Sequence, residues 1–279
     1  MTRSDPPASL PFAKMHGAGN DFAIFWSRGD APVLTPALAR AVACRRFGVG
    51  CDQVVEVRPG SAGGLKLVFF NADGSVSGAC GNATRCIAAA EMNARDADAL
   101  DLVTDFGMLK ARRDADGAVW VNMGRPVHDP GAIPLSATED TDTLPLPGAP
   151  AAVGMGNPHC VHIVDDADAV DVAGRGAEIE RHPLFPARTN VEFASLCRED
   201  ALRLRVWERG AGITPACGSG ACATAVVAHR RGLTGPHVTL AMDGGTLEVR
   251  VTETGVWLTG PVALIYSGEL SPDFLQGLQ

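Results

Sequence analysis

The sequence predicts an α/β protein, of the α+β type, built from two similar halves. Helix and strand signals are mixed along the chain, and polar landmarks of its first half recur 137 positions later. The last third is rich in short strands separated by Gly-containing turns. We therefore expect two pseudo-symmetric halves, residues 1–125 and 126–267, with the C-terminal segment 268–279 returning to the first half.

Individual elements follow from local patterns. Pro36–Phe47 is predicted to be a helix that stops at Gly48. Leu202–Trp207 (LRLRVW) alternates strictly, which is typical of a half-buried strand. Pro126–Pro150 is rich in Pro, Asp and Thr and is predicted to connect the two halves. The other predicted strands are Leu65–Phe70, Ala118–Asn122, Val161–Val164, His237–Ala241, Thr246–Val251 and Val256–Leu258.

Composition excludes several classes of function. Apolar residues make up 46% of the 279 residues and charged residues 20%, the profile of a packed globular protein. The formal charge of −8 argues against unspecific nucleic-acid binding. No apolar run approaches the ~20 residues needed to cross a bilayer, and the first residues lack the apolar core of a signal peptide. We therefore expect a cytoplasmic protein with no membrane and no nucleic-acid partner.

The eight cysteines are expected to be reduced thiols. A chain of this length without an export signal rarely depends on a disulfide framework, and no CxxC motif occurs. The segment His159-Cys160-Val161-His162 has metal-ligating residue types, but it alternates like a strand and no second ligand cluster accompanies it. No metal site is predicted.

The internal repeat is carried by polar residues at one constant offset. In each half the order is a Gly-Asn loop, a strand, a helix, a polar residue, a strand, a second polar residue, a turn, and Cys-Gly at a helix start. The pairs 137 positions apart are Asn20 and Asn157, Gln53 and Asn190, Asn71 and Glu208, and Cys80 and Cys217. If the halves are related by a pseudo-twofold axis, equivalent loops face one another, and the cleft between the halves is the expected ligand site.

The two Cys-Gly segments indicate a specific chemistry. Cys217 precedes Gly218-Ser219-Gly220 and an Ala-rich run typical of a buried helix, whose first amides have no internal partner. Cys80-Gly81-Asn82 offers the same arrangement. Such helix starts attract anions and lower the pKa of a thiol. Two of them aimed at one point would hold a carboxylate, with one thiol on each side of its α-carbon.

A base and an acid on opposite sides of an α-carbon describe racemisation or epimerisation. One thiolate would remove the α-proton while the opposite thiol protonates the other face. Backbone amides would stabilise the charge that spreads onto the carboxylate. The chain's three lysines, Lys14, Lys66 and Lys110, lie in no motif for a pyridoxal phosphate Schiff base, so no cofactor is expected.

Seven motifs together resemble diaminopimelate epimerase, in the right order, from about Phe12 to Gly268. They are HGAGNDF (16–22), GVGCDQ (48–53), FNADGSVSGACGNATRC (70–86), VNMG (121–124), MGNPH (155–159), RTNVEF (188–193) and ERGAGITPACGSGA (208–221). The resemblance implies two α/β halves, each a mixed or antiparallel sheet wrapped around a central helix. It implies interconversion of LL- and meso-2,6-diaminopimelate, without cofactor or metal, for lysine and peptidoglycan precursor synthesis.

The resemblance also assigns residues. The catalytic cysteines match Cys80 and Cys217, and His159 and Glu208 match positions that tune the thiols. The substrate-binding positions match Asn20, Gln53, Asn71, Gly81, Asn82, Asn157, Asn190, Glu208, Arg209, Gly218 and Ser219. Arg209 is also the natural fork for a distal carboxylate on chemical grounds. Ala83 and Ile213 depart from the family, which often has Gly and Glu there.

The sequence leaves three alternative functions open. The runner-up is a related cofactor-independent racemase of another amino acid, such as proline or histidine. Arg209 and the amide side chains favour a substrate with a second amino-acid head, which proline lacks. An amino-acid-binding protein without catalysis and a thiol redox protein are further alternatives. The expected partner is a small-molecule substrate, and a homodimer is the expected assembly.

Overall fold

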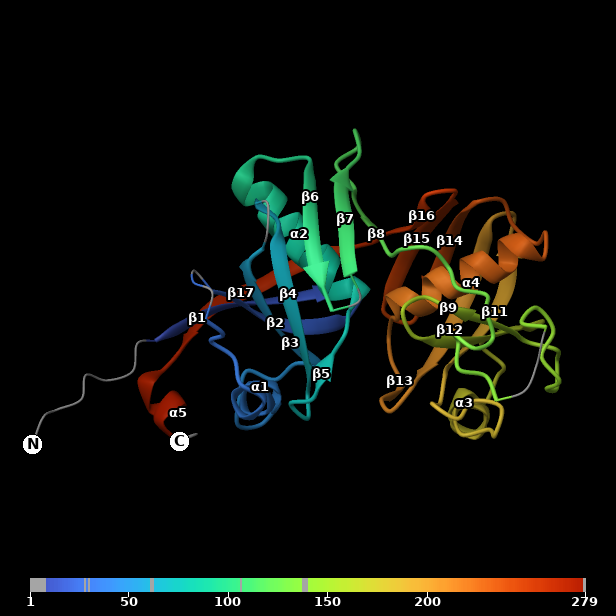
Figure 1. Cartoon of the computed structure of the whole chain (residues 1–279), viewed down its shortest axis with the longest axis horizontal. Coiled ribbons are helices and arrows are strands. Elements are labelled where there is room, and N and C mark those ends of the chain that lie inside the picture. Colours follow the sequence, from blue (N-terminus) through green and yellow to red (C-terminus); the bar gives the residue numbers. More distant parts are fainter. Residues whose placement is uncertain are drawn as a thin grey trace, which may run out of the picture. The chain divides into compact units, whose positions relative to one another are not determined.

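The computed structural model describes residues 9–27, 29, 31–60, 63–105, 107–136 and 140–277 (Figure 1). The chain divides into two compact units. Unit 1 comprises residues 1–17, 21–108 and 262–279, and unit 2 comprises residues 18–20 and 109–261. Both units mix helices with strands, as the sequence predicts, and each is described by itself.

Unit 1 is a mixed sheet with two main helices. Strand β1 pairs with β17 and with β2, β2 runs parallel to β3, β3 is antiparallel to β4, and β4 runs parallel to β6. Strand β5 forms a short hairpin with β4. The elements are β1 Leu10–Gly17, β2 Asn20–Trp26, α1 Pro36–Ala43, β3 Gln53–Pro59, β4 Leu65–Asn71, β5 Val76–Ser77, α2 Gly81–Arg95, β6 Ala99–Thr104, β17 Val262–Leu270 and α5 Pro272–Gln276. Strand β7, Gly107–Arg113, leads into unit 2.

Unit 2 repeats this topology. Strand β9 is antiparallel to β10, β10 runs parallel to β11, β11 is antiparallel to β12, β12 runs parallel to β14, and β13 forms the hairpin with β12. Strands β15, β16 and β8 continue the sheet. The elements are β8 Val119–Asn122, β9 Ala151–Gly154, β10 Pro158–Ile163, α3 Val172–Glu180, β11 Asn190–Arg198, β12 Ala201–Glu208, β13 Gly212–Ile213, α4 Gly218–Arg230, β14 His237–Met242, β15 Gly245–Thr252 and β16 Gly255–Thr259.

The strand register confirms the duplication residue by residue. In unit 1 Phe22 pairs with Gln53, and in unit 2 the residues 137 positions later, His159 and Asn190, pair in the same way. The hairpin pairs Phe70–Val76 and Trp207–Ile213 show the same offset. Helices α2 and α4 begin 137 positions apart, at Gly81 and Gly218.

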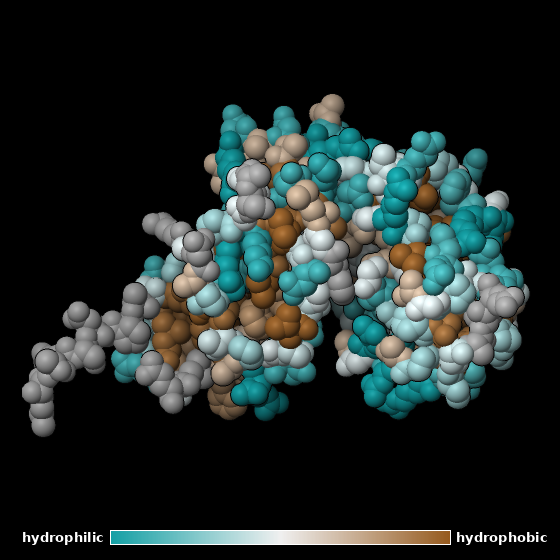
Figure 2. Space-filling view, in the orientation of Figure 1, coloured by the Kyte–Doolittle hydropathy of each residue, from teal (hydrophilic) through white to brown (hydrophobic). Residues whose placement is uncertain are grey.

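Each unit has a central helix within its curved sheet. Helix α4 contacts β9, β10, β11, β15 and β16, and ten of its thirteen residues are buried (Figure 1). Its Ala-rich sequence explains this position, because small side chains let the strands approach the helix from several directions. Helix α2 contacts β1, β6 and β17 and is buried over most of its length. On the visible face, unit 1 carries patches of apolar side chains, whereas unit 2 is mostly hydrophilic (Figure 2).

Two strands exchange between the sequence halves. Strand β8, from the first half, pairs with β16 in unit 2, and β17, near the C-terminus, pairs with β1 in unit 1. The compact units therefore divide the chain at other places than the predicted halves. Residues 18–20 also belong to unit 2, where the close approach of Ala18 to Gly244 leaves no room for a Cβ at residue 244.

Two predictions about segments are wrong. The helix predicted over Pro36–Phe47 ends at Ala43, because the chain turns back and the amides of Gly50 and Cys51 donate to the carbonyls of Val42 and Ala43. Residues 126–150, predicted to connect the halves, lie inside unit 2. There Ile133 and Leu144 are buried against Phe185.

A charged network ties together the start of β2 and the approach to β3 in unit 1. The buried Lys14 donates to Asp21 at 2.6 Å and to the carbonyl of Gly50. Arg45 bridges Asp21 and Asp52 at 2.9 and 2.7 Å. Burial alone would raise the pKa of the Asp21 carboxyl, but the hydrogen bonds from Arg45 and Lys14 outweigh it and lower the pKa to about 2.

This network predicts an acid-sensitive contribution to stability. Asp21 has a lower pKa in the folded state than its ordinary 3.8, so its contribution is present above pH ~4 and is lost as the pH falls toward ~2. Asp21→Asn should lower the free energy of unfolding at pH 7 by on the order of 2 kcal/mol, because Lys14 loses its counter-charge. Urea unfolding from pH 7 to pH 2 measures this. A difference between the two proteins that stays constant down to pH 2 would contradict it.

Candidate active site

Cys217 forms the N-cap of α4. Its Sγ accepts a hydrogen bond from the Gly220 amide at 3.4 Å and lies 3.5 Å from the Ser219 hydroxyl, and the residue is only 5% exposed. Gly218 is the first residue of the helix, and the sulfur caps the helix start through the Gly220 amide. This is the anion-attracting helix start that the sequence predicts.

Two carboxylates oppose ionisation of the Cys217 thiol. Burial raises its pKa well above the ordinary value, and the neighbouring Glu208 and Glu192 raise it further, against the smaller opposing effect of Ser219 and Gly220. Burial likewise raises the pKa of Glu208, which accepts a hydrogen bond from Thr214. Cys217 is therefore a protonated thiol at neutral pH in this arrangement. The sequence predicts a lowered thiol pKa at this helix start, and for Cys217 that prediction is wrong, because burial and the two carboxylates outweigh the effect of the helix start.

His159 lies on β10 of unit 2 and is completely buried. Its Nδ1 is 2.7 Å from Oε1 of Glu192, and its Nε2 is 2.8 Å from Oδ1 of Asn157. Both ring nitrogens are thus engaged by these two residues. The electrostatic influence of His159 reaches Glu208, whose pKa it lowers against the effect of burial.

Asn190 is held by the backbone on two sides. Its Nδ2 donates to the Pro158 carbonyl at 2.8 Å, and its Oδ1 accepts from the Arg209 amide at 2.9 Å. Asn190 therefore fixes the backbone of Arg209, whose exposed guanidinium donates to the carbonyl of Ala187. The second Nδ2 hydrogen of Asn190 takes part in neither of these two contacts.

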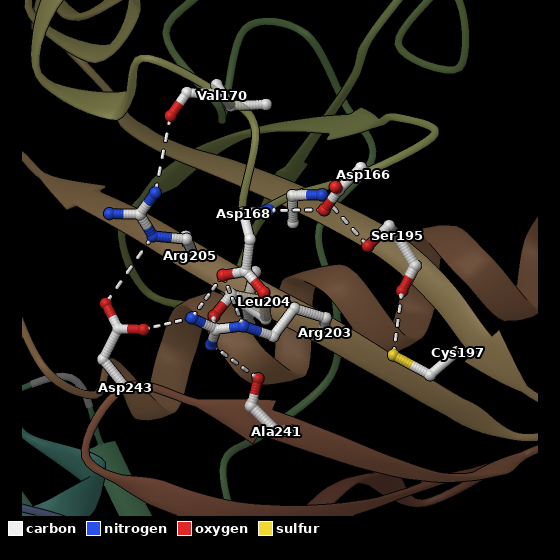
Figure 3. Close-up of polar contacts among 11 residues, drawn as sticks. Asp166, Asp168, Val170, Ser195, Cys197, Arg203, Leu204, Arg205, Ala241 and Asp243 are labelled. Atoms are coloured by element: carbon white, nitrogen blue, oxygen red, sulfur yellow. Dashed lines mark hydrogen bonds and ion pairs between the residues drawn. The ribbon is translucent and has the colours of Figure 1, made fainter.

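Arg203 anchors β12, the strand that ends at Glu208. Its Nε donates to Asp168 at 2.9 Å, Nη1 donates to the Ala241 carbonyl at 3.1 Å, and Nη2 pairs with Asp243 (Figure 3). Figure 3 shows the guanidinium between the two carboxylates. These contacts tie β12 to the loop before α3 and to the turn between β14 and β15.

Unit 1 presents the equivalent arrangement around Cys80. Cys80 is the N-cap of α2 and is partly exposed, and the helix begins with the buried Gly81 and Asn82. Gln53 donates from Nε2 to Oδ1 of Asn71 at 2.9 Å, and Asn71 donates to Ser75. These contacts thus join Gln53 to Asn71, and Cys80, Gly81 and Asn82 follow one another at the start of α2. Gln53 and Asn71 carry amide side chains where unit 2 has Asn190 and Glu208.

Asn20 lies in a different unit from the one that the sequence predicts. The sequence assigns it to the first half, but residues 18–20 pack with unit 2. Unit 2 therefore carries Asn20 as well as the other predicted residues. Those are Asn157, His159, Asn190, Glu208, Arg209, Cys217, Gly218 and Ser219.

The two departures from the family pattern occupy ordinary positions. Ala83 is a buried residue in the first turn of α2, and Ile213 is a partly exposed residue of the short strand β13, 46% exposed. Glu192 is the functional candidate that sequence reasoning missed. Its only signal is a charged residue in the otherwise apolar stretch VEF after Asn190.

Solved structures share this fold. A probable proline racemase from Agrobacterium radiobacter K84 has a TM-score of 0.67 at 16% identity, covering 94% of this chain and 93% of its own. A hydroxyproline epimerase from Agrobacterium vitis has a TM-score of 0.66 at 15% identity, covering 96% and 94%. At such identities the likeness establishes the fold alone, a duplicated α/β class that includes racemases and epimerases.

Sequence comparison identifies the family. The model of the family described as diaminopimelate epimerase matches residues 12–128 and 151–265. A diaminopimelate epimerase of Rhodospirillum centenum is 50% identical over 273 residues, 95% of this chain and 94% of that protein. One from Erythrobacter litoralis is 47% identical, covering 93% and 96%. The chain belongs to the diaminopimelate epimerase family.

The protonated state of Cys217 predicts slow alkylation. Iodoacetamide reacts with thiolates, and each pKa unit above ~8.5 lowers the thiolate fraction about tenfold. At pH 7.5 we expect Cys217 to react at least ~10 times more slowly than the exposed Cys197, as measured by peptide mass spectrometry over time. Equal rates would show that the carboxylates and burial do not suppress the Cys217 thiolate.

Proposed function

We propose that the chain interconverts LL- and meso-2,6-diaminopimelate by moving the α-proton between Cys80 and Cys217. The observation that carries this proposal is that both cysteines are N-caps of central helices at equivalent positions of the repeat. The names of relatives that are 42–50% identical over nearly the whole chain support the substrate.

The helix starts supply the site for the reacting carboxylate. The amides of Gly81 and Asn82 on α2, and of Gly218 and Ser219 on α4, lie in the first turns, the helix ends that attract anions. An α-carboxylate bound there would be stabilised further as charge moves onto it during proton removal.

The chemical step needs only the two thiols. The Cys80 thiolate takes the α-proton, the bonding electrons move into the carboxylate, and the Cys217 thiol gives its proton to the opposite face of the same carbon. Turnover leaves Cys80 protonated and Cys217 ionised, and the reverse reaction exchanges the roles. The raised pKa of Cys217 makes it the donor in the resting arrangement.

The remaining polar residues are proposed to recognise the distal amino-acid head. Arg209 would pair with the distal carboxylate, and Glu208 would receive an ammonium group. The amide side chains of Asn20, Gln53, Asn71, Asn157 and Asn190 complete the proposed set. A second head group is what distinguishes this substrate from proline, so this set argues against the runner-up racemase activity.

The remaining expectations stay proposals. We propose that the enzyme works in the cytoplasm without cofactor or metal, and without nucleic-acid or membrane partners. In the described part of the chain, no helix combines the length and apolar character needed to span a membrane. A homodimer is proposed as the assembly, supported by the exposed apolar side chains of Leu264, Ile265 and Tyr266 on β17.

Incubation of the purified protein with LL-diaminopimelate, followed by chiral separation, tests the activity. Cys80→Ser and Cys217→Ser should each lower turnover by about 10²- to 10⁴-fold, because an alcohol is a far weaker acid than a thiol. Cys197→Ser is the matched control, since this exposed cysteine lies outside the proposed site. Near-normal turnover in either site variant would refute the assignment, and retained substrate binding without any turnover in the unmodified protein would favour a binding protein.

A further inference from the structure

Glu192 is a buried carboxylate that the proton transfer does not use. It lies on β11, two residues after Asn190, and its side chain has no exposed surface. Its Oε1 is 2.7 Å from Nδ1 of His159, and within the described part of the chain its Oε2 has no hydrogen-bond partner. Such a group costs free energy to bury, so its presence requires an explanation.

His159 connects Glu192 to Asn157. Oδ1 of Asn157 is an acceptor only, so the ring nitrogen 2.8 Å away, Nε2, donates to it. Nδ1 is 2.7 Å from the Glu192 carboxyl group, and the two share one buried hydrogen bond. A chain of contacts therefore runs from Glu192 through His159 to Asn157.

Glu192 also borders the start of α4. A Cβ at Gly220 would lie 2.8 Å from Oε1 of Glu192 and 3.3 Å from Sγ of Cys217, so only glycine fits between them. Three other titratable groups interact electrostatically with His159 or Glu192. They are Glu208, Cys217 and the buried Cys160. The pair thus lies within the electrostatic environment of the catalytic thiol.

The first repeat shows that the fold does not need this pair. Phe22 and Val55 stand 137 positions before His159 and Glu192, and Phe22 holds the same register against Gln53 as His159 does against Asn190. Both Phe22 and Val55 are completely buried. The same place in the same topology is therefore filled by apolar side chains in unit 1.

We propose that Glu192 is a positioning residue of the Cys217 half of the site, which orients the His159 ring and thereby fixes the Asn157 amide for substrate. The substrate part of this inference rests on the proposed function, whereas the Glu192–His159 hydrogen bond and the anchoring of Asn157 do not. His159 is accordingly a hydrogen-bond donor to Asn157.

Nuclear magnetic resonance of the full chain tests this chain of contacts directly. In the unmodified protein at pH 7, Nε2 of His159 should carry a slowly exchanging proton. In Glu192→Gln the ring signals of His159 and the side-chain amide signals of Asn157 should both shift. An unprotonated Nε2 in the unmodified protein, or unchanged Asn157 signals in the variant, would overturn the proposal.

Kinetics test the consequence for the reaction. Glu192→Gln should lower kcat/KM about 10- to 100-fold, as expected when a substrate-orienting group is misplaced. The control is Glu56→Gln, which removes a second completely buried carboxylate that holds the amides of Val33 and Leu34. This control should lower stability while leaving kcat and KM unchanged.

A double variant separates positioning from packing. His159→Phe with Glu192→Val copies the arrangement of unit 1, so its melting temperature should exceed that of Glu192→Val alone, while kcat/KM stays low. Restored kcat/KM in the double variant would show that the pair only fills space. If the unmodified protein does not turn over diaminopimelate, the proposed function fails, and the resonance experiment still decides the role of Glu192.

Discussion

The structure depends on one constraint, the unpaired backbone amides at the start of a buried helix. A central helix enclosed by a sheet has its N-terminus at the edge of the core, where its first amides need an external partner. In both units a cysteine is the cap, and the residues that follow are small or amide-bearing. The short strand that precedes each cysteine pairs with a longer one: β5 pairs with β4 in unit 1, and β13 pairs with β12 in unit 2. This pairing brings β4 or β12 close to the cap.

The duplication preserves the strand register but is unequal in charge. Cys217 has Glu208, Glu192 and His159 near it, whereas the equivalent positions in unit 1 are Asn71, Val55 and Phe22. A two-sided proton transfer requires one thiol to hold a proton while the other lacks it. The carboxylates of Glu208 and Glu192 favour the protonated thiol at Cys217, and the equivalent positions 71 and 55 in unit 1 carry uncharged side chains.

The sequence was sufficient for the repeat, most strands and the residues of the helix caps. The constant offset between polar residues predicted the topology, since register is preserved when a domain duplicates. The early end of α1 and the pairing of β8 with β16 were not predictable, because they depend on which carbonyls and strand edges find partners in three dimensions. Glu192 escaped notice because its partners His159 and Gly220 are distant in sequence.

The central claim is that one α-carbon is approached by two thiols from opposite faces. The most direct measurement is the early reaction in D2O, started separately from each stereoisomer and followed by mass spectrometry. The account predicts that the product carries one deuterium, delivered by the opposite thiol, while the remaining substrate carries none. Deuterium appearing in the remaining substrate as fast as in the product would indicate a single base and would contradict the account.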